Sequence, residues 1–149
     1  MTVEGKEPFE MPQTSTDEQV SFGVTLPAGT DKRHITRIAP LIDNSKIIHH
    51  ILLLQSDKAV SPEPVNCFFA DPDWKLLYAW GPGTPPLDLP AEAGFPIEKD
   101  EPTHFVLQIH YNNLNQLEGE KDRSGVELCT TTDLRTHDAD VLALGGIGF

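Results

Sequence analysis

Thirteen prolines and eleven glycines divide this 149-residue chain into short apolar segments. None of these segments keeps a 3.6-residue hydrophobic period for a dozen residues, as an amphipathic helix would. In residues 20–26, by contrast, every second side chain is apolar, which is the period of a half-buried strand. The sequence therefore predicts an all-β fold.

Polar turns such as Asn112-Asn113 and Glu118-Gly119 separate the apolar segments. Seven strands are predicted, at residues 20–26, 34–39, 46–55, 75–80, 103–112, 125–131 and 139–144. Residues 46–55 are the most continuously apolar, as in a strand covered on both faces. This spacing predicts an antiparallel β-sandwich, jelly-roll-like in type.

The length of 149 residues fits one domain. Residues 1–15 are predicted to be a loose N-terminal tail, and residues 16–149 a single domain. The two cysteines, Cys67 and Cys129, form no C-x-x-C metal motif. They are predicted to be either one disulfide or two buried thiols.

The chain carries 11 basic and 23 acidic residues, a formal net charge of -12. This charge opposes binding to phosphate backbones and to anionic lipid, so neither nucleic acid nor a membrane is predicted as a partner. No run approaches the ~18 apolar residues of a membrane span, and the first residues lack the basic and apolar regions of a signal peptide. These features leave the compartment open.

His49 and His50 interrupt the most apolar run of the chain. Two adjacent buried imidazoles need polar partners, or they cost a few kcal/mol, on the order of a lost hydrogen bond each. A metal ion would satisfy both rings. The alternative is that one ring hydrogen-bonds a backbone carbonyl while the other reaches solvent.

Strand geometry separates residues 103–112 into two faces, one of them apolar and predicted to face the core, and one that carries His104, Val106, Gln108 and His110. His110 would complete a three-imidazole site if this strand runs beside the His49-His50 strand. Neighbouring residues on a regular strand point to opposite faces, so a shared site needs a bulge or a strand end. The other histidines are predicted to be solvated or hydrogen-bonded: His34, His104 and His137.

Three neutral imidazoles suit copper or zinc. Two nearly collinear rings with a distant third would favour Cu(I), whereas a tetrahedral set with an open position would favour zinc. A zinc hydrolase would also need a carboxylate base, for which Asp43 or Glu63 is a candidate. Two further alternatives are a stand-alone module that sequesters or delivers copper and a metal-free β-sandwich that binds other proteins.

Four blocks of sequence resemble a known family, and this resemblance is independent of the patterns above. They read IHHILL (48–53), LYAW (77–80), LPAEAGF (89–95) and FVLQIHY (105–111). In this order they resemble the copper type II, ascorbate-dependent monooxygenases, the family of peptidylglycine α-hydroxylating monooxygenase and dopamine β-monooxygenase. The resemblance covers most of the chain, from about residue 20 to its end.

The resemblance implies the N-terminal of two copper-binding β-sandwich domains. It implies that His49, His50 and His110 hold an electron-transfer copper, reduced by ascorbate as an external reductant, and that Gln108 lies close to the metal. It also implies a second copper domain as partner and a secreted, periplasmic or secretory-lumen setting.

The chain departs from the family pattern in one decisive respect. The family's catalytic copper is held by a His-x-His pair and a methionine in the C-terminal domain, and this chain has no His-x-His; its methionines are Met1 and Met11. It is therefore expected not to hydroxylate a substrate alone. The apolar residues 141–149 suggest a truncated chain.

Overall fold

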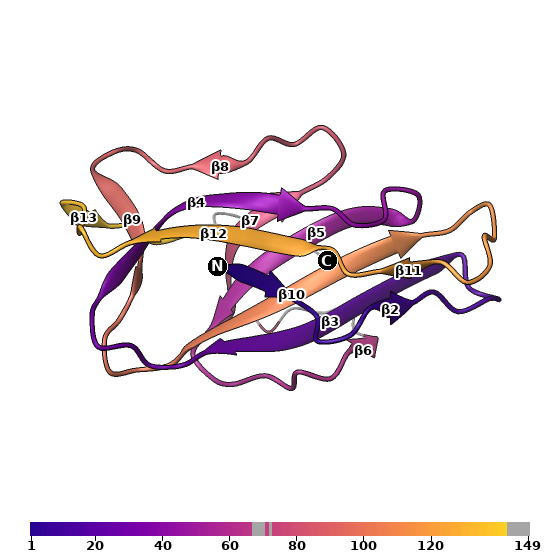
Figure 1. Ribbon diagram of the computed structural model, residues 1–149, viewed down its shortest axis with the longest axis horizontal. Coiled ribbons are helices and arrows are strands. Elements are labelled where there is room, and N and C mark those ends of the chain that lie inside the picture. Colours follow the sequence, from indigo (N-terminus) through magenta and orange to yellow (C-terminus); the bar gives the residue numbers. More distant parts are fainter. Residues whose placement is uncertain (67–70, 72, 143–149) are drawn as a thin grey trace, which may run out of the picture.

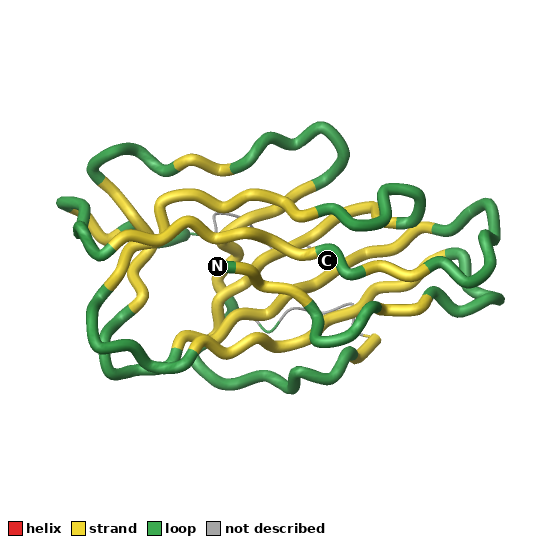
Figure 2. The backbone as a smooth tube through the Cα atoms, viewed as in Figure 1, coloured by secondary structure: helices red, strands yellow, loops and turns green. Residues whose placement is uncertain are grey.

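The computed structural model describes residues 1–66, 71 and 73–142. These residues form strands and loops and no helix, as Figure 2 shows, so the all-β prediction is confirmed. The strands are β1 (Thr2–Glu4), β2 (Phe9–Glu10), β3 (Asp17–Leu26), β4 (Arg33–Leu41), β5 (Ile48–Ser56), β6 (Val65–Asn66), β7 (Lys75–Trp80), β8 (Leu87–Asp88), β9 (Ala93–Ile97), β10 (Thr103–Asn112), β11 (Lys121–Asp122), β12 (Gly125–Thr131) and β13 (His137–Asp138). Across the described residues, nothing forms a helix long and apolar enough to cross a membrane.

The strands build the predicted antiparallel sandwich (Figure 1). One sheet has the order β1-β12-β4-β9-β13, with β8 added beside β4, and the other has the order β6-β3-β10-β5-β7. A short ribbon of β11 and β2 extends from them. Among the strands described, only β13 and β9 pair in parallel.

The core lies between the two sheets. Ile38 and Leu128 from the first sheet and Leu53 and Leu107 from the second are all 0% exposed. Burying each such side chain contributes roughly 1.5–3 kcal/mol relative to leaving it in water. The predicted strands at 75–80, 103–112 and 125–131 match the observed bounds.

The second sheet is also covered on part of its outer face. Gly23 of β3 donates a backbone hydrogen bond to Ser61 at 2.6 Å, and a Cβ at Gly23 would lie 2.2 Å from the Val60 oxygen. The loop after β5 therefore packs directly on β3. Beside it on β10, Val106 and Gln108 are buried, although the sequence pattern placed both on the face opposite the core.

The N-terminal residues differ from the loose tail predicted for residues 1–15. β1 pairs with β12 and β2 pairs with β11, and Val3 and Met11 are almost fully buried. Phe9 stacks on Tyr111 with ring centroids 4.7 Å apart. Apolar side chains at these positions account for the ordered strands, since their burial offsets the entropy of ordering the chain.

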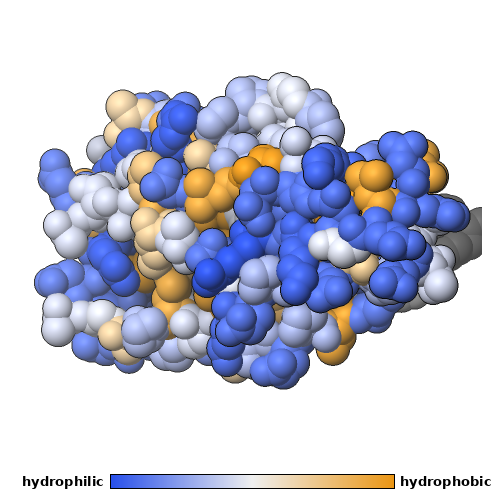
Figure 3. All heavy atoms as spheres, turned by 45° about the vertical axis from the view of Figure 1, so that its right-hand side comes forward, coloured by the Kyte–Doolittle hydropathy of each residue, from blue (hydrophilic) through white to orange (hydrophobic). Residues whose placement is uncertain are grey.

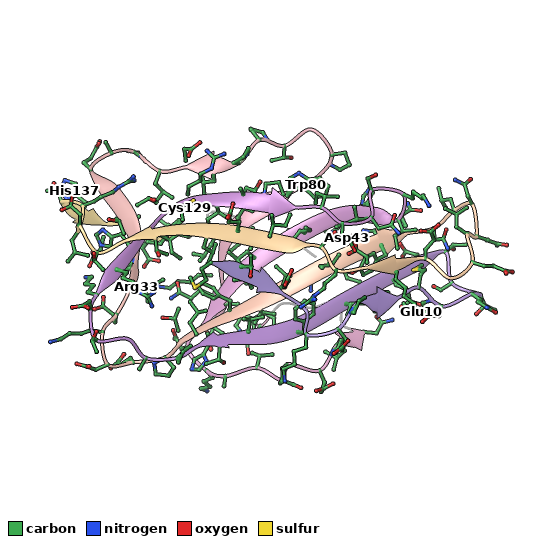
Figure 4. The ribbon with its side chains drawn as sticks, in the orientation of Figure 1. Glu10, Arg33, Asp43, Trp80, Cys129 and His137 are labelled. Atoms are coloured by element: carbon green, nitrogen blue, oxygen red, sulfur yellow. The ribbon has the colours of Figure 1, made fainter. Side chains whose placement is uncertain are left out.

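Two further expectations near the C-terminal end need correction. Residues 139–142 form no strand, and the rest of the strand predicted at 139–144 lies outside the described residues. Cys129 on β12, labelled in Figure 4, is exposed and has a free thiol, so it is neither a buried thiol nor half of a disulfide. Cys67 lies outside the described residues.

The face drawn in Figure 3 is mostly hydrophilic, with apolar side chains in small separate groups. This surface agrees with the net charge of -12. Scattered exposed apolar residues are ordinary on a folded domain.

His34 fixes the segment after β12 to the first sheet. Its ring is 1% exposed; Nδ1 accepts the backbone N–H of Arg135 at 3.1 Å, so Nε2 donates to Asp138 at 2.7 Å. Lys32 donates to the other oxygen of Asp138 at 2.6 Å. His34 is thus hydrogen-bonded, which is one of the two alternatives predicted for it.

Replacing Asp138 with alanine should lower the free energy of unfolding by more than the loss of an exposed ion pair does, because the buried Nε2–H of His34 loses its acceptor. Hydrogen bonds from Lys32 and His34 lower the pKa of Asp138 below its ordinary 3.8. The carboxylate's contribution is therefore present at neutral pH and is lost as the pH falls through the lowered pKa. Urea denaturation at pH 7 and below pH 4 measures both effects.

The matched control is Asp140→Ala. Asp140 also accepts from a lysine, Lys75, at 3.0 Å, but in an exposed ion pair. Such pairs contribute about 0–1 kcal/mol. Equal losses in the two variants would show that the buried imidazole is not what Asp138 stabilises.

Candidate metal centre

The His49-His50 pair and His110 lie on neighbouring strands. β5 and β10 pair antiparallel, and His50 stands directly opposite His110. The condition that the sequence left open, that the two strands run side by side, is therefore met.

A β-bulge resolves the problem of two consecutive histidines on one strand. The register of β5 against β10 passes from His110 opposite His50 to Tyr111 opposite Ile48, which leaves His49 as an extra residue. A bulge of this kind turns the extra side chain toward the face of its neighbour. Both rings of the pair consequently reach His110.

The three Nδ1 atoms converge on one point. Nδ1 of His49 lies 3.2 Å from that of His50 and 3.1 Å from that of His110, and the third side of the triangle is 3.3 Å. The triangle is nearly equilateral, so it is not the collinear pair with a distant third ring that the sequence argument linked to Cu(I). The cluster is a possible metal-binding group.

The donor set fits a metal ion. Neutral imidazole has one nitrogen with a lone pair, and three lone pairs this close repel one another unless a proton or a cation lies between them. The centre of the triangle is about 1.8 Å from each nitrogen. If the three rings move slightly apart, this distance reaches the roughly 2.0–2.1 Å typical of metal–imidazole bonds.

The electrostatics of the site favour a neutral His50 ring. Burial lowers the pKa of His50 from its ordinary 6.5, and the neighbouring His110 and His49 lower it further. His49 is exposed, while the other two rings are partly buried. The site therefore opens to solvent on the His49 side.

Asp17 is a site residue that the sequence argument missed. Its Oδ1 lies 2.5 Å from Nε2 of His110, the ring nitrogen that faces away from the cluster. Asp17 precedes the first predicted strand, and only the register of β3 against β10 brings it beside His110. No local sequence pattern predicts how β3 and β10 are aligned.

Gln108 lies on the same face of β10 as His110 and is buried. It accepts a hydrogen bond from Gln19 at 3.2 Å and donates one to Ser21 at 3.0 Å. These bonds tie β10 to β3 next to the histidines. The expectation that Gln108 acts close to a metal stays a prediction.

The remaining candidates lie outside the cluster. His104 hydrogen-bonds Thr25 at 2.9 Å, and His137 is exposed on β13. Asp43, labelled in Figure 4, accepts the backbone N–H of Arg123, and Glu63 is exposed in the loop before β6. Neither carboxylate belongs to the metal-binding group, so the base expected of a zinc hydrolase has no support at this site.

A buried hydrogen-bond network joins the two segments that carry the cluster. Tyr111, next to His110, donates to Asp122 at 3.0 Å, and the backbone N–H of Asn44 donates to the same carboxylate at 2.9 Å. Asn44 begins the turn into β5, since the N–H groups of Ile47 and Ile48 both bond its carbonyl. Asp122 thus joins the two segments that carry the histidines.

Comparison with known proteins gives one family. Residues 6–118 match the model of the copper type II ascorbate-dependent monooxygenase, N-terminal domain. The chain is 32% identical over 149 residues to the putative DBH-like monooxygenase protein 2 of Homo sapiens, covering 95% of this chain and 30% of the relative. It is 31% identical to the dopamine beta-hydroxylase of Equus caballus, covering 80% of this chain and 22% of that protein.

The tyramine beta-hydroxylase of Caenorhabditis briggsae is 32% identical over 121 residues. The chain spans less than a third of the length of each of these relatives. The resemblance drawn from the four sequence blocks is confirmed. The chain belongs to the copper type II ascorbate-dependent monooxygenases and corresponds to their N-terminal domain.

Proposed function

We propose that this chain is an electron-transfer domain of a copper monooxygenase and that it binds one copper ion through Nδ1 of His49, His50 and His110. The observation that carries the proposal is the convergence of three Nδ1 atoms to within 3.3 Å across a bulged strand pair. Membership of a copper-dependent family favours copper over zinc at this triangle.

When bound, copper supplies one-electron chemistry, cycling between Cu(II) and Cu(I) with ascorbate as external reductant. The three imidazoles hold the ion without adding charge and tolerate both oxidation states. The lowered pKa of His50 keeps that ring neutral near pH 7. The exposed His49 edge leaves a route for an external reductant and for a partner domain.

The partner in this proposal is a second copper domain, which would carry out hydroxylation of a C–H bond. In three of the relatives, the part that matches this chain is less than a third of the whole protein. Those proteins therefore have room for a further domain. The setting we propose is secreted, periplasmic or lumenal, by family resemblance. The chain alone is not expected to hydroxylate.

Anaerobic titration with Cu(I) against a chromophoric competitor tests the proposal. The parent chain should bind one tight equivalent. His49→Ala, His50→Ala and His110→Ala should each weaken binding by about 100-fold or more, because two imidazoles cannot replace three. His104→Ala removes a partly buried histidine from the other end of β10, outside the cluster, and should leave the affinity unchanged.

Two outcomes would contradict the proposal. Absence of binding by the parent chain would favour a metal-free sandwich that binds other proteins. Unchanged binding in the His110 variant would remove the three-histidine site. The redox part is tested separately by adding ascorbate to the Cu(II)-loaded chain and measuring the loss of the Cu(II) electron paramagnetic resonance signal.

A further inference from the structure

We infer that Asp17 is a positioning residue for the copper site, holding the His110 ring so that its Nδ1 faces the other two imidazoles. This inference rests on the proposed function, since it concerns the same site. The supporting contact joins Oδ1 of Asp17 to Nε2 of His110 at 2.5 Å.

The strand register builds this contact. Asp17 stands opposite Asn112 on β10, and Gln19 stands opposite His110. Residues two apart on a strand share a face, so Asp17 is the diagonal neighbour of His110, within reach of a long or ring side chain. The backbone N–H of Asp17 also bonds Oγ of Ser15 at 3.4 Å, at the point where β3 begins.

The hydrogen bond to Asp17 selects one tautomer of the His110 ring. An ionised carboxylate only accepts hydrogen bonds, so Nε2 of His110 must carry the proton. In a neutral imidazole the lone pair then belongs to Nδ1, the atom that faces His49 and His50. A carboxylate in this position also fixes the ring's rotation and makes the metal-binding nitrogen more basic.

Asp17 acts on one histidine of the three. In the described part of the chain, no aspartate or glutamate forms an ion pair with His49 or His50. The side chain of Asp17 is 73% exposed, whereas that of His110 is 20% exposed. A contact at the solvent edge adds little to folding, so its removal should act on the site rather than on the sandwich.

The test compares Asp17→Ala and Asp17→Asn with Glu18→Gln. Glu18→Gln removes the same unit of charge one residue away, from a side chain that accepts a hydrogen bond from Asn66 and does not touch the cluster. In the Cu(I) competition titration, Asp17→Ala should bind about tenfold more weakly or worse. Asp17→Asn should retain part of the affinity, because its amide oxygen can still accept from Nε2–H. Glu18→Gln should bind as the parent does.

A second measurement needs no metal. Nitrogen-15 shifts of the His110 ring in the copper-free chain should report the Nε2–H form in the parent and in Glu18→Gln. In Asp17→Ala they should move toward a mixture of the two tautomers, while the thermal midpoint stays close to that of the parent.

The outcomes separate the two proposals. If the parent binds Cu(I) and loses it in the three histidine variants, while Asp17→Ala keeps both full affinity and the Nε2–H form, only the role of Asp17 is overturned. If the parent chain binds no Cu(I), the copper site fails and the role of Asp17 fails with it.

Discussion

Replacing Asp122 with alanine should lower the free energy of unfolding by at least about 3 kcal/mol. The carboxylate is 1% exposed and accepts four hydrogen bonds. The donors are the Tyr111 hydroxyl, the backbone N–H of Asn44, and the backbone N–H and hydroxyl of Ser124, at 2.7 to 3.0 Å. Each buried donor left without an acceptor costs roughly 1–3 kcal/mol, less where water replaces the lost oxygen.

The same change should weaken the metal site. Burial raises the pKa of Tyr111, and the charge of Asp122 raises it further, so the phenol stays protonated and donates. Without Asp122, both the end of β10 and the turn into β5 lose their shared anchor. We therefore expect Cu(I) affinity to fall even where the variant remains folded.

Asp43→Ala is the control for Asp122→Ala. Asp43 lies at the same junction and accepts the backbone N–H of Arg123 at 2.9 Å, but in an exposed position. Its loss should cost about 1 kcal/mol. Urea denaturation followed by tryptophan fluorescence compares the two variants, and similar losses would show that the buried network is not a stabilising centre.

Much of the sandwich could be predicted from the sequence because strand alternation is a local signal. β7, β10 and β12 carry apolar residues at every second position or in a short run, and their bounds match the prediction. The N-terminal strands could not be recognised in this way. β1 and β2 have three and two residues, too few to show a period, and their order depends on pairing with β12 and β11, more than a hundred residues away.

The three histidines could be recognised as candidates for a different reason, although only the family resemblance implied that they share one site. Two adjacent imidazoles in an apolar run are costly without a partner, and His110 lies on the polar side of an otherwise apolar strand. The need for a bulge also followed from strand geometry. Asp17 could not be found, because its contact with His110 depends on the register of β3 against β10, which no local pattern encodes.

Deleting His49 should abolish tight copper binding while leaving the sandwich folded. β5 places His50 opposite His110 and Ile48 opposite Tyr111, so removing the residue between them makes the ladder regular. Every other residue of β5 keeps its partner and its face. The loss of one imidazole should weaken Cu(I) binding by more than about 100-fold, above the range seen when only a residue behind a ligand is lost.

Deleting Ile51 is the matched comparison, since it shortens β5 by one residue at nearly the same place. The ladder again becomes regular, but His50 moves into the position of Ile51, which is 0% exposed. An imidazole forced into the core should cost several kcal/mol, roughly the price of a lost apolar side chain plus an unpaired polar group. Thermal unfolding and Cu(I) titration of both deletions distinguish the two roles of the bulge. A His49 deletion as unstable as the Ile51 deletion would mean that the bulge is needed for folding; a stable one that binds no copper would mean that its role is to turn a second imidazole toward the metal.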